Sequence, residues 1–132
     1  MLIPTIHFAG NCNEVIEFYK QTIGAEVQMI AFAKDAPEDL GVPPDFVTYS
    51  EIKIFGTLCT LSDGCESPPS GLNHTFTVQF DTADEVVDVF NKLSVDGNVL
   101  QPLGQQFYAD MTGMFTDRFG VNWCLLTKSM PE

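Results

Sequence analysis

The sequence predicts an α+β fold built from two tandem βαβββ modules. The first observation is a repeated Phe-Gly pair beside an apolar stretch, Phe55-Gly56 before TLCTL and Phe119-Gly120 before VNWCLL. The second is a pair of matching amphipathic segments, 14–20 and 85–91, in the same order relative to those pairs. Gly adopts backbone angles that other residues resist, so each Phe-Gly pair predicts the turn of a β-hairpin. The chain therefore consists of two related halves.

The first module, residues 1–64, is expected to contain one helix and four strands. Asn11 and Glu14 have the spacing of a helix N-cap with a reciprocal carboxylate, and Gly24 supplies the stop. Apolar residues at helical spacing between them predict the buried face, namely Val15, Ile16, Tyr19 and Ile23. The strands are expected at 2–8, 26–32, 46–55 and 57–62, and a solvated loop at 33–45 with four acidic residues and three prolines is preferred to a lid over a pocket.

The strand 46–55 shows an alternation that assigns its two faces. Tyr49, Glu51 and Lys53 fall on one face, and Ile52 and Ile54 fall on the other. The polar face is either solvated or turns the Glu51 carboxylate toward a ligand.

The second module, residues 72–128, repeats the order. Thr82 and Glu85 form a capping-box sequence after a strand at 74–80, and Gly97 is expected to end the helix. Its buried stripe is Ala83, Val86, Val87, Phe90 and Leu93. Strands at 99–103, 111–116 and 121–127 complete the module. A Pro, Gly and Ser-rich linker, Asp63 to Asn73, joins the modules into one domain over 1–132.

Composition excludes several classes of partner. The 132 residues include 18 acidic and 6 basic side chains, and the net charge of −12 repels both phosphate backbones and anionic lipid. We expect no leader sequence, because no basic region precedes an apolar segment, and no membrane span, because no apolar run approaches the length that crosses a bilayer. The four cysteines, Cys12, Cys59, Cys65 and Cys124, lack a Cys-x-x-Cys pair, which favours free thiols in the cytoplasm. We therefore expect a cytoplasmic protein without a nucleic-acid or membrane partner.

Three short motifs resemble one known family over nearly the whole chain. They are Phe18-Tyr19-Lys20 in the first helix, Leu61-Ser62-Asp63 at the end of a strand, and GMFTDRFGVNW at 113–123. With the two βαβββ modules, they resemble the PhnB-like group of the vicinal oxygen chelate superfamily, also called the glyoxalase, bleomycin resistance protein and dioxygenase fold.

The resemblance implies a curved mixed sheet forming a cup around a small-molecule pocket, and usually a homodimer. Enzymes of the superfamily commonly bind one divalent metal through one side chain from each of four equivalent strands. Some PhnB-like chains carry a demethylubiquinone methyltransferase label, to which we give little weight because no glycine-rich strand-to-helix loop is present to hold the methyl donor.

Internal spacing locates the four positions that the resemblance assigns to the metal. Carrying the spacing between the two helices back from His74 gives Ile3, and mid-strand positions after the Phe-Gly pairs give Thr60 and Cys124. An isoleucine cannot coordinate a metal, and His, Glu or Gln are expected at these places. We therefore expect no metal cofactor; if one binds, His74 is its anchor. Otherwise His74 is a pocket-lining or strand-edge histidine, and Cys124 a small buried hydrophobe.

The predicted function is to bind a small organic molecule in a sheet-lined cup without an obligatory metal. Strand parity and fold analogy assign six residues to this pocket, Tyr49, Glu51, His74, Phe76, Tyr108 and Cys124. One alternative is a divalent-metal-dependent lyase, isomerase or dioxygenase. A second is a protein that confers drug resistance by sequestering its ligand, and a third is a purely structural dimer. The sequence does not decide whether the chain is an enzyme.

Overall fold

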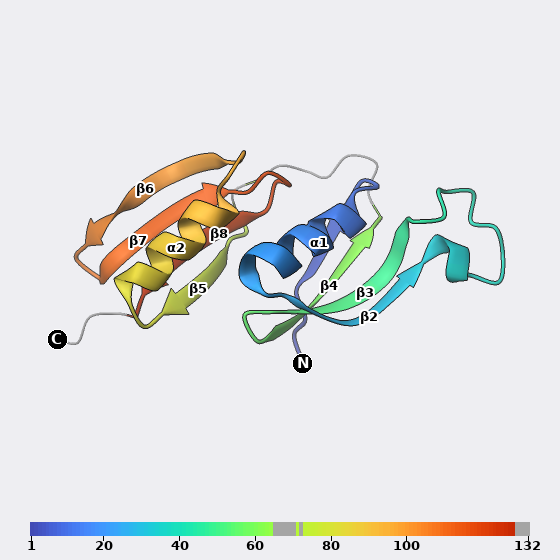
Figure 1. Ribbon diagram of the computed structural model, residues 1–132, viewed down its shortest axis with the longest axis horizontal. Coiled ribbons are helices and arrows are strands. Elements are labelled where there is room, and N and C mark those ends of the chain that lie inside the picture. Colours follow the sequence, from blue (N-terminus) through green and yellow to red (C-terminus); the bar gives the residue numbers. More distant parts are fainter. Residues whose placement is uncertain (65–70, 72, 129–132) are drawn as a thin grey trace. The chain divides into compact units, whose positions relative to one another are not determined.

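The computed structural model describes residues 1–64, 71 and 73–128, and it confirms the α+β prediction. The chain divides into two compact units, 1–69 and 70–132, and each contains one α-helix and one four-stranded sheet. Figure 1 shows a helix running along one side of the sheet in each unit. In the described residues, neither helix is long and apolar enough to cross a bilayer.

The first unit has the predicted order of strand, helix and three strands. Its elements are β1 Thr5–Phe8, α1 Cys12–Ile23, β2 Glu26–Phe32, a short 3-10 helix η1 Ala33–Asp35, β3 Val47–Ile54 and β4 Thr57–Asp63. The strands are ordered β1-β4-β3-β2. β1 runs parallel to β4, whereas the β2–β3 and β3–β4 pairs are antiparallel.

The second unit repeats this topology. Its elements are β5 Phe76–Phe80, α2 Ala83–Leu93, β6 Asn98–Gln106, β7 Ala109–Thr116 and β8 Asn122–Thr127, in the sheet order β5-β8-β7-β6. The first strand of each unit starts later than predicted, at Thr5 and Phe76. The predicted linker begins with Asp63, which is the last residue of β4. Positions 65–70 and 72 of that linker lie outside the described residues.

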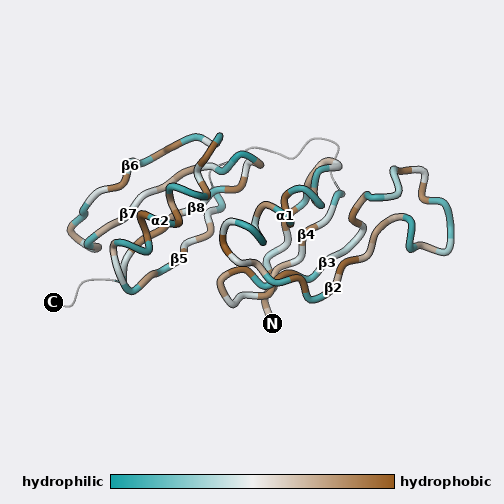
Figure 2. Tube along the Cα trace, in the orientation of Figure 1, coloured by the Kyte–Doolittle hydropathy of each residue, from teal (hydrophilic) through white to brown (hydrophobic). Residues whose placement is uncertain are grey.

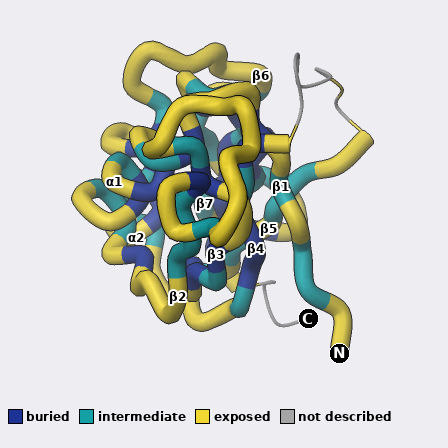
Figure 3. The backbone as a smooth tube through the Cα atoms, turned by 90° about the vertical axis from the view of Figure 1, so that its right-hand side faces the viewer, coloured by how far each residue is buried: buried dark blue, intermediate teal, exposed yellow. Residues whose placement is uncertain are grey.

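The core of the first unit lies between α1 and its sheet. On β3, Ile52 is fully buried and Ile54 nearly so, whereas Tyr49 and Lys53 are exposed, which confirms the predicted alternation. Cys59 and Leu61 on β4 are buried as well, and Val15, Ile16 and Tyr19 are the buried residues of the predicted α1 stripe. Figure 3 colours the segments by burial; Met1 and Leu2 are exposed, and Ile3 and Pro4 just before β1 are partly buried.

The core of the second unit is aromatic. The rings of Phe90 on α2 and Phe115 on β7 meet edge to face with centroids 5.0 Å apart. Gly113 permits this approach, because a Cβ there would lie 2.7 Å from the Phe90 ring. Figure 2 shows hydrophobic and hydrophilic residues interleaved along α2, as expected for a helix with one buried face.

The N-terminus of α1 is capped in a way that the sequence did not predict. Asn11 occupies the N-cap position, but its side chain makes no capping hydrogen bond. Instead Oδ1 of Asp63, at the end of β4, accepts from the backbone N–H groups of Gly10 at 2.8 Å and Cys12 at 2.9 Å. Its other oxygen accepts from Val47 N at 3.0 Å, at the start of β3. One buried carboxylate therefore joins a turn, a helix and two strands.

The second helix begins as predicted. Thr82 Oγ1 accepts from the Glu85 N–H, and the Glu85 carboxylate accepts from the Thr82 N–H, which completes the capping box. It ends earlier than predicted, because α2 stops at Leu93 and Gly97 lies in the following turn. Glycine is needed at position 97 for a different reason: a Cβ there would lie 2.2 Å from the Thr116 carbonyl oxygen.

The two Phe-Gly hairpins use different turns. Phe55 and Gly56 have φ angles of 49° and 79° and form a two-residue turn, in which both residues occupy the left-handed region. At the second hairpin only Gly120 has a positive φ, of 88°, and the loop is longer. Oδ1 of the buried Asp117 accepts from the backbone N–H groups of Phe119 and Val121, and Oδ2 accepts from Trp123 Nε1.

The segment after η1 is exposed from Pro37 to Asp45. Its ends are tied to the sheet by the Ala33 N–H, which donates to Phe46 O, and by the Lys34 N–H, which donates to Pro44 O. This placement is that of a solvated connection, as the sequence predicted.

We predict that Asp63→Ala destabilises the first unit by roughly 3–5 kcal/mol, because three backbone N–H groups lose their acceptor, two of them in buried hydrogen bonds and one in a part-buried hydrogen bond. Urea unfolding followed by far-UV circular dichroism measures the loss. Asp39→Ala is the matched control, since Asp39 accepts only from Gly41 N in the exposed loop. Equal unfolding midpoints for the two variants would show that Asp63 does not hold these elements together.

Candidate functional site

Each sheet has one face packed against the helix of its own unit; we call the opposite face the open face. In the first unit Ser50, Ile52 and Leu61 point toward α1, since all three are fully buried. The alternate residues of β3 and β4 therefore point to the open face. In the second unit Phe115 contacts Phe90 of α2, so its neighbours Met114 and Thr116 belong to the open face.

The open face of the first sheet carries a set of polar pairs between β1 and β4. Thr5 and Thr60 are register partners, and their Oγ1 atoms are 2.6 Å apart. His7 and Ser62 are the next pair, with 3.2 Å between Nδ1 and Oγ. Gly64 leaves room for the His7 ring, since a Cβ at that position would lie 3.1 Å from Nδ1.

β3 continues this polar face with Tyr49 and Glu51. The Tyr49 hydroxyl donates to Glu51 Oε2 at 3.0 Å. This hydrogen bond raises the pKa of Tyr49 above its ordinary value, with smaller contributions from burial and from the Glu51 charge, so the phenol is protonated at neutral pH. Glu51 lies beside Thr60 on one side and Met29 of β2 on the other, as its register partners.

The open face of the second sheet is built around Cys124. Its register partners are Thr77 on β5 and Met114 on β7. Cys124 is partly buried and Thr77 is exposed. A thiol and a hydroxyl therefore stand side by side on this face.

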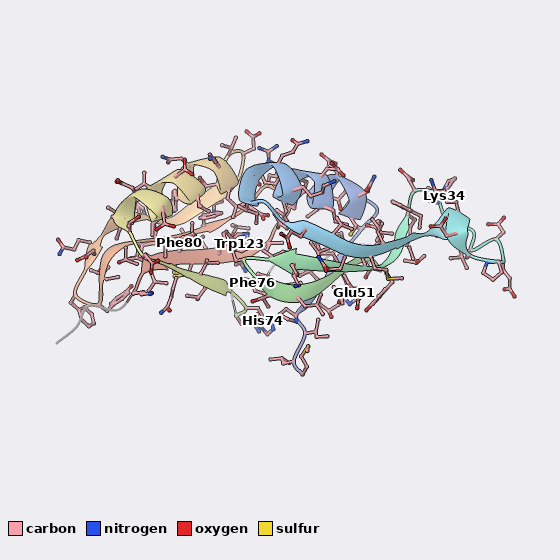
Figure 4. The ribbon with its side chains drawn as sticks, turned by 60° about the horizontal axis from the view of Figure 1, so that its bottom comes forward. Lys34, Glu51, His74, Phe76, Phe80 and Trp123 are labelled. Atoms are coloured by element: carbon pink, nitrogen blue, oxygen red, sulfur yellow. The ribbon has the colours of Figure 1, made fainter. Side chains whose placement is uncertain are left out.

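The structure brings some of the six predicted pocket residues together and separates others. Tyr49 and Glu51 are hydrogen-bonded to each other. Phe76 lies on the helix-facing side of its sheet, because it pairs with Trp123 at 5.6 Å between ring centroids and Trp123 pairs with Phe115; Figure 4 labels both side chains.

His74 and Tyr108 lie outside the strands. His74 is exposed and precedes β5, and its carbonyl accepts from Asn122 Nδ2 at 3.0 Å. Tyr108 lies in the β6–β7 turn, where its ring meets Phe107 edge to face at 5.1 Å. The sixth residue, Cys124, is the only one of the four in the second unit that lies on the open face of its sheet.

Strand register shows which residues lie beside two of the four positions assigned to a metal. Thr60 and Cys124 are equivalent, because the spacing between the Phe-Gly pairs also separates them. Their parallel partners are Thr5 and Thr77. On the open faces Thr5 therefore lies beside Thr60 and Thr77 beside Cys124, whereas Ile3 and His74 precede the first strand of their units.

The four side chains Thr5, Thr60, Thr77 and Cys124 do not fit a divalent metal. Three neutral hydroxyls and one thiol replace the imidazoles and carboxylates that hold such ions, and two of the hydroxyls already bond to each other. Within the described part of the chain, no three His, Cys, Asp or Glu side chains are grouped so that they could hold a metal ion.

Sequence reasoning missed the pairs Thr5–Thr60 and His7–Ser62. The signal was present as polar residues at alternate positions of β1 and β4, with apolar Ile6 and Leu61 between them. Period-two alternation identifies such a face, but the partner of each residue depends on register, which sequence spacing left open.

The described thiols differ in reactivity. Cys12 is fully buried at the start of α1, and burial together with the neighbouring Asp63 carboxylate raises its pKa to about 12. Burial also raises the pKa of Cys59. The usual effect of a helix N-terminus, which lowers a thiol pKa, is outweighed at Cys12. Cys65 lies outside the described residues.

Comparisons with known proteins agree with this architecture. A family model described as 3-demethylubiquinone-9 3-methyltransferase matches residues 1–126. Protein YjdN of Escherichia coli (strain K12) is 28% identical over 144 residues, covering 98% of this chain and 97% of YjdN. The crystal structure of PA1353 from Pseudomonas aeruginosa is similar with a TM-score of 0.82 and 29% identity, covering 97% of each chain.

Two further solved structures share the fold. A PhnB protein from Bacillus cereus, described as a putative 3-demethylubiquinone-9 3-methyltransferase, has a TM-score of 0.81 and 23% identity, covering 96% of this chain and 98% of its own. The fosfomycin resistance protein FosX of Listeria monocytogenes has a TM-score of 0.67 and 13% identity, covering 98% and 93%.

We predict that iodoacetamide at pH 8 leaves Cys12 unmodified in the folded protein and alkylates Cys124. A thiol with a pKa of about 12 is ionised to only about one part in ten thousand at pH 8. Peptide mass mapping after timed quenching measures each site, and labelling in urea is the control that exposes all thiols. Rapid alkylation of Cys12 without urea would contradict its burial.

Proposed function

Because this chain belongs to the family described as 3-demethylubiquinone-9 3-methyltransferase, a PhnB-like group with the glyoxalase fold, we propose that it binds a small organic molecule without an obligatory metal. The ligand lies against the open face of a sheet. The first sheet offers Tyr49, Glu51 and Thr60 as candidate contacts, and the second sheet offers Thr77 and Cys124 as its own.

One observation carries the proposal. The four register-equivalent positions on the open faces hold Thr5, Thr60, Thr77 and Cys124. Three of these side chains are neutral hydroxyls, and Cys124 alone could coordinate a divalent cation, as a thiolate, which falls short of the three protein ligands of a catalytic site. An open face of this kind suits an uncomplexed organic ligand better than a metal-activated reaction.

The methyl-transfer activity in the family description finds no support in the helix termini. A nucleotide-like methyl donor is often held by free N–H groups at the start of a helix. The N–H groups of Gly10 and Cys12 at α1 already donate to Asp63, and Thr82 and Glu85 cap each other at α2. We therefore leave methyl transfer out of the proposal.

The expected setting is a cytoplasmic homodimer. Both expectations rest on the family resemblance and the composition. Light scattering of the protein as it elutes from a size-exclusion column measures its molar mass and so tests the dimer directly.

We predict that no divalent ion raises the thermal unfolding temperature of the chelator-treated protein. In particular, we expect no increase that reaches a plateau as the ion concentration rises and that one ion produces but the others do not. A ligand at about a hundred times its dissociation constant stabilises the native state by roughly 2.7 kcal/mol, which a scan resolves. Titrations with Mg²⁺, Mn²⁺, Ni²⁺ and Zn²⁺ measure this. A selective increase that His74→Ala or Cys124→Ala abolishes would favour the metal-dependent alternative.

A panel of small organic molecules is expected to give at least one saturable increase in the same assay. Thr60→Val or Thr77→Val, which remove a hydroxyl at nearly constant volume, should reduce that increase. Thr22→Val is the matched control, because its hydroxyl donates to Phe18 O within α1 and not on an open face. If every stabilising compound raises the unfolding temperature of Thr60→Val and of Thr77→Val as much as that of the unchanged protein, the proposed site is wrong.

A further inference from the structure

We propose that the open face of the first sheet binds an organic ammonium, with Glu51 as the charged partner, Tyr49 as its aromatic neighbour and Met29 as the apolar contact. The inference rests on the proposed function and deepens it by stating the chemical class of the ligand. It concerns the first unit alone.

The candidate site is one row across the sheet. Met29 on β2 is the register partner of Glu51 on β3, which is the register partner of Thr60 on β4, and Thr60 pairs with Thr5 on β1. Directly paired residues point to the same face. Met29 is 44% exposed and Tyr49 is 42% exposed. A carboxylate thus stands between exposed apolar surface and a hydroxyl pair.

The charge of Glu51 is not matched by a cation of the protein. Within the described residues, the salt bridges involve Glu17, Asp88, Asp96 and Asp81 and not Glu51. The cationic groups on this face are Lys53 and, when protonated, His7. Lys53 has Glu26 as its register partner, and His7 is bonded to Ser62. Among the hydrogen bonds of the described residues, Glu51 accepts one, from the neutral hydroxyl of Tyr49.

Tyr49 holds the Glu51 carboxylate by a hydrogen bond and places its own aromatic ring beside that carboxylate. Its hydroxyl donates to Glu51 Oε2, which leaves the other carboxylate oxygen able to accept from a ligand. The exposed ring is two residues from Glu51 on the same strand face, within reach of a cation held by the carboxylate. Met29 on the neighbouring strand offers a polarisable contact to the body of the ligand.

The arrangement selects by charge. An ammonium supplies N–H donors to Glu51, whereas a carboxylate or phosphonate is repelled by Glu51 and by the net charge of −12. A neutral alcohol can donate a hydrogen bond to Glu51 but has no charge for the carboxylate to attract. The expected order of affinity is therefore cation, neutral molecule, anion.

Three probes of matched size test this order: benzylammonium, benzyl alcohol and benzoate. Calorimetry and NMR of the protein with ¹³C-labelled methionine methyl groups follow binding to the intact chain. We expect benzylammonium to bind tightest and to shift the Met29 methyl signal. Added salt should weaken its binding, and Glu51→Gln should weaken it about ten-fold, while benzyl alcohol changes little.

Glu38→Gln is the matched control, because it removes the same charge from the exposed loop of the same unit and leaves Glu51 and the register pair Glu26–Lys53 in place. Its effect on benzylammonium binding should be within about two-fold. Equal losses in the two variants, benzoate binding as tight as benzylammonium, or no binding of benzylammonium would each overturn the inference. If benzyl alcohol still binds and Thr60→Val weakens that binding, the proposed function stands even when the ammonium site does not. The proposed function and the ammonium site can therefore be overturned separately.

Discussion

The carboxylate of Asp63 is the interaction on which the first unit depends. It accepts from N–H groups of the β1–α1 turn, the helix start and the start of β3, so the three segments are fixed relative to the end of β4. In the second unit, separate side chains cap the helix and bind the strand next to it. Thr82 caps α2 through its own hydroxyl, and Thr127 on β8 accepts only from Met111 N, at the start of β7. The pseudo-symmetry therefore holds for the strand order and not for the hydrogen bonds that secure it.

The positions of the elements could be predicted because they depend on local patterns. Helical spacing, the Thr82–Glu85 capping box and the alternation of Glu51 with Ile52 are all read within a few residues. Asp63 could not be recognised as the cap of α1, since its contacts with Gly10 and Cys12 join residues distant in the sequence. Local propensity carries no information on such a partner.

The candidate site depends on register, and register limited its prediction. A shift of one residue moves a side chain to the opposite face of a sheet. The family resemblance placed one position at His74 and the helix spacing carried it back to Ile3, whereas the residues that pair with Thr60 and Cys124 are Thr5 and Thr77. The same sensitivity separates Phe76, which packs toward α2, from Cys124, which faces away from it. Tyr49 and Glu51 were assigned correctly to one face because they lie on one strand and need no pairing to relate them.

The hydrogen bond between Trp123 and Asp117 gives the chain a local optical reporter. Trp123 is the single tryptophan of the sequence, it is 2% exposed, and its indole N–H donates to a buried carboxylate at 2.9 Å. Intrinsic fluorescence excited at the red edge of the absorption band therefore arises from the second unit. Melting of the first unit alone lowers the far-ultraviolet signal, while the hydrogen bond from Trp123 to Asp117 within the second unit is kept. The difference between the two signals measures how cooperatively the halves of this chain unfold.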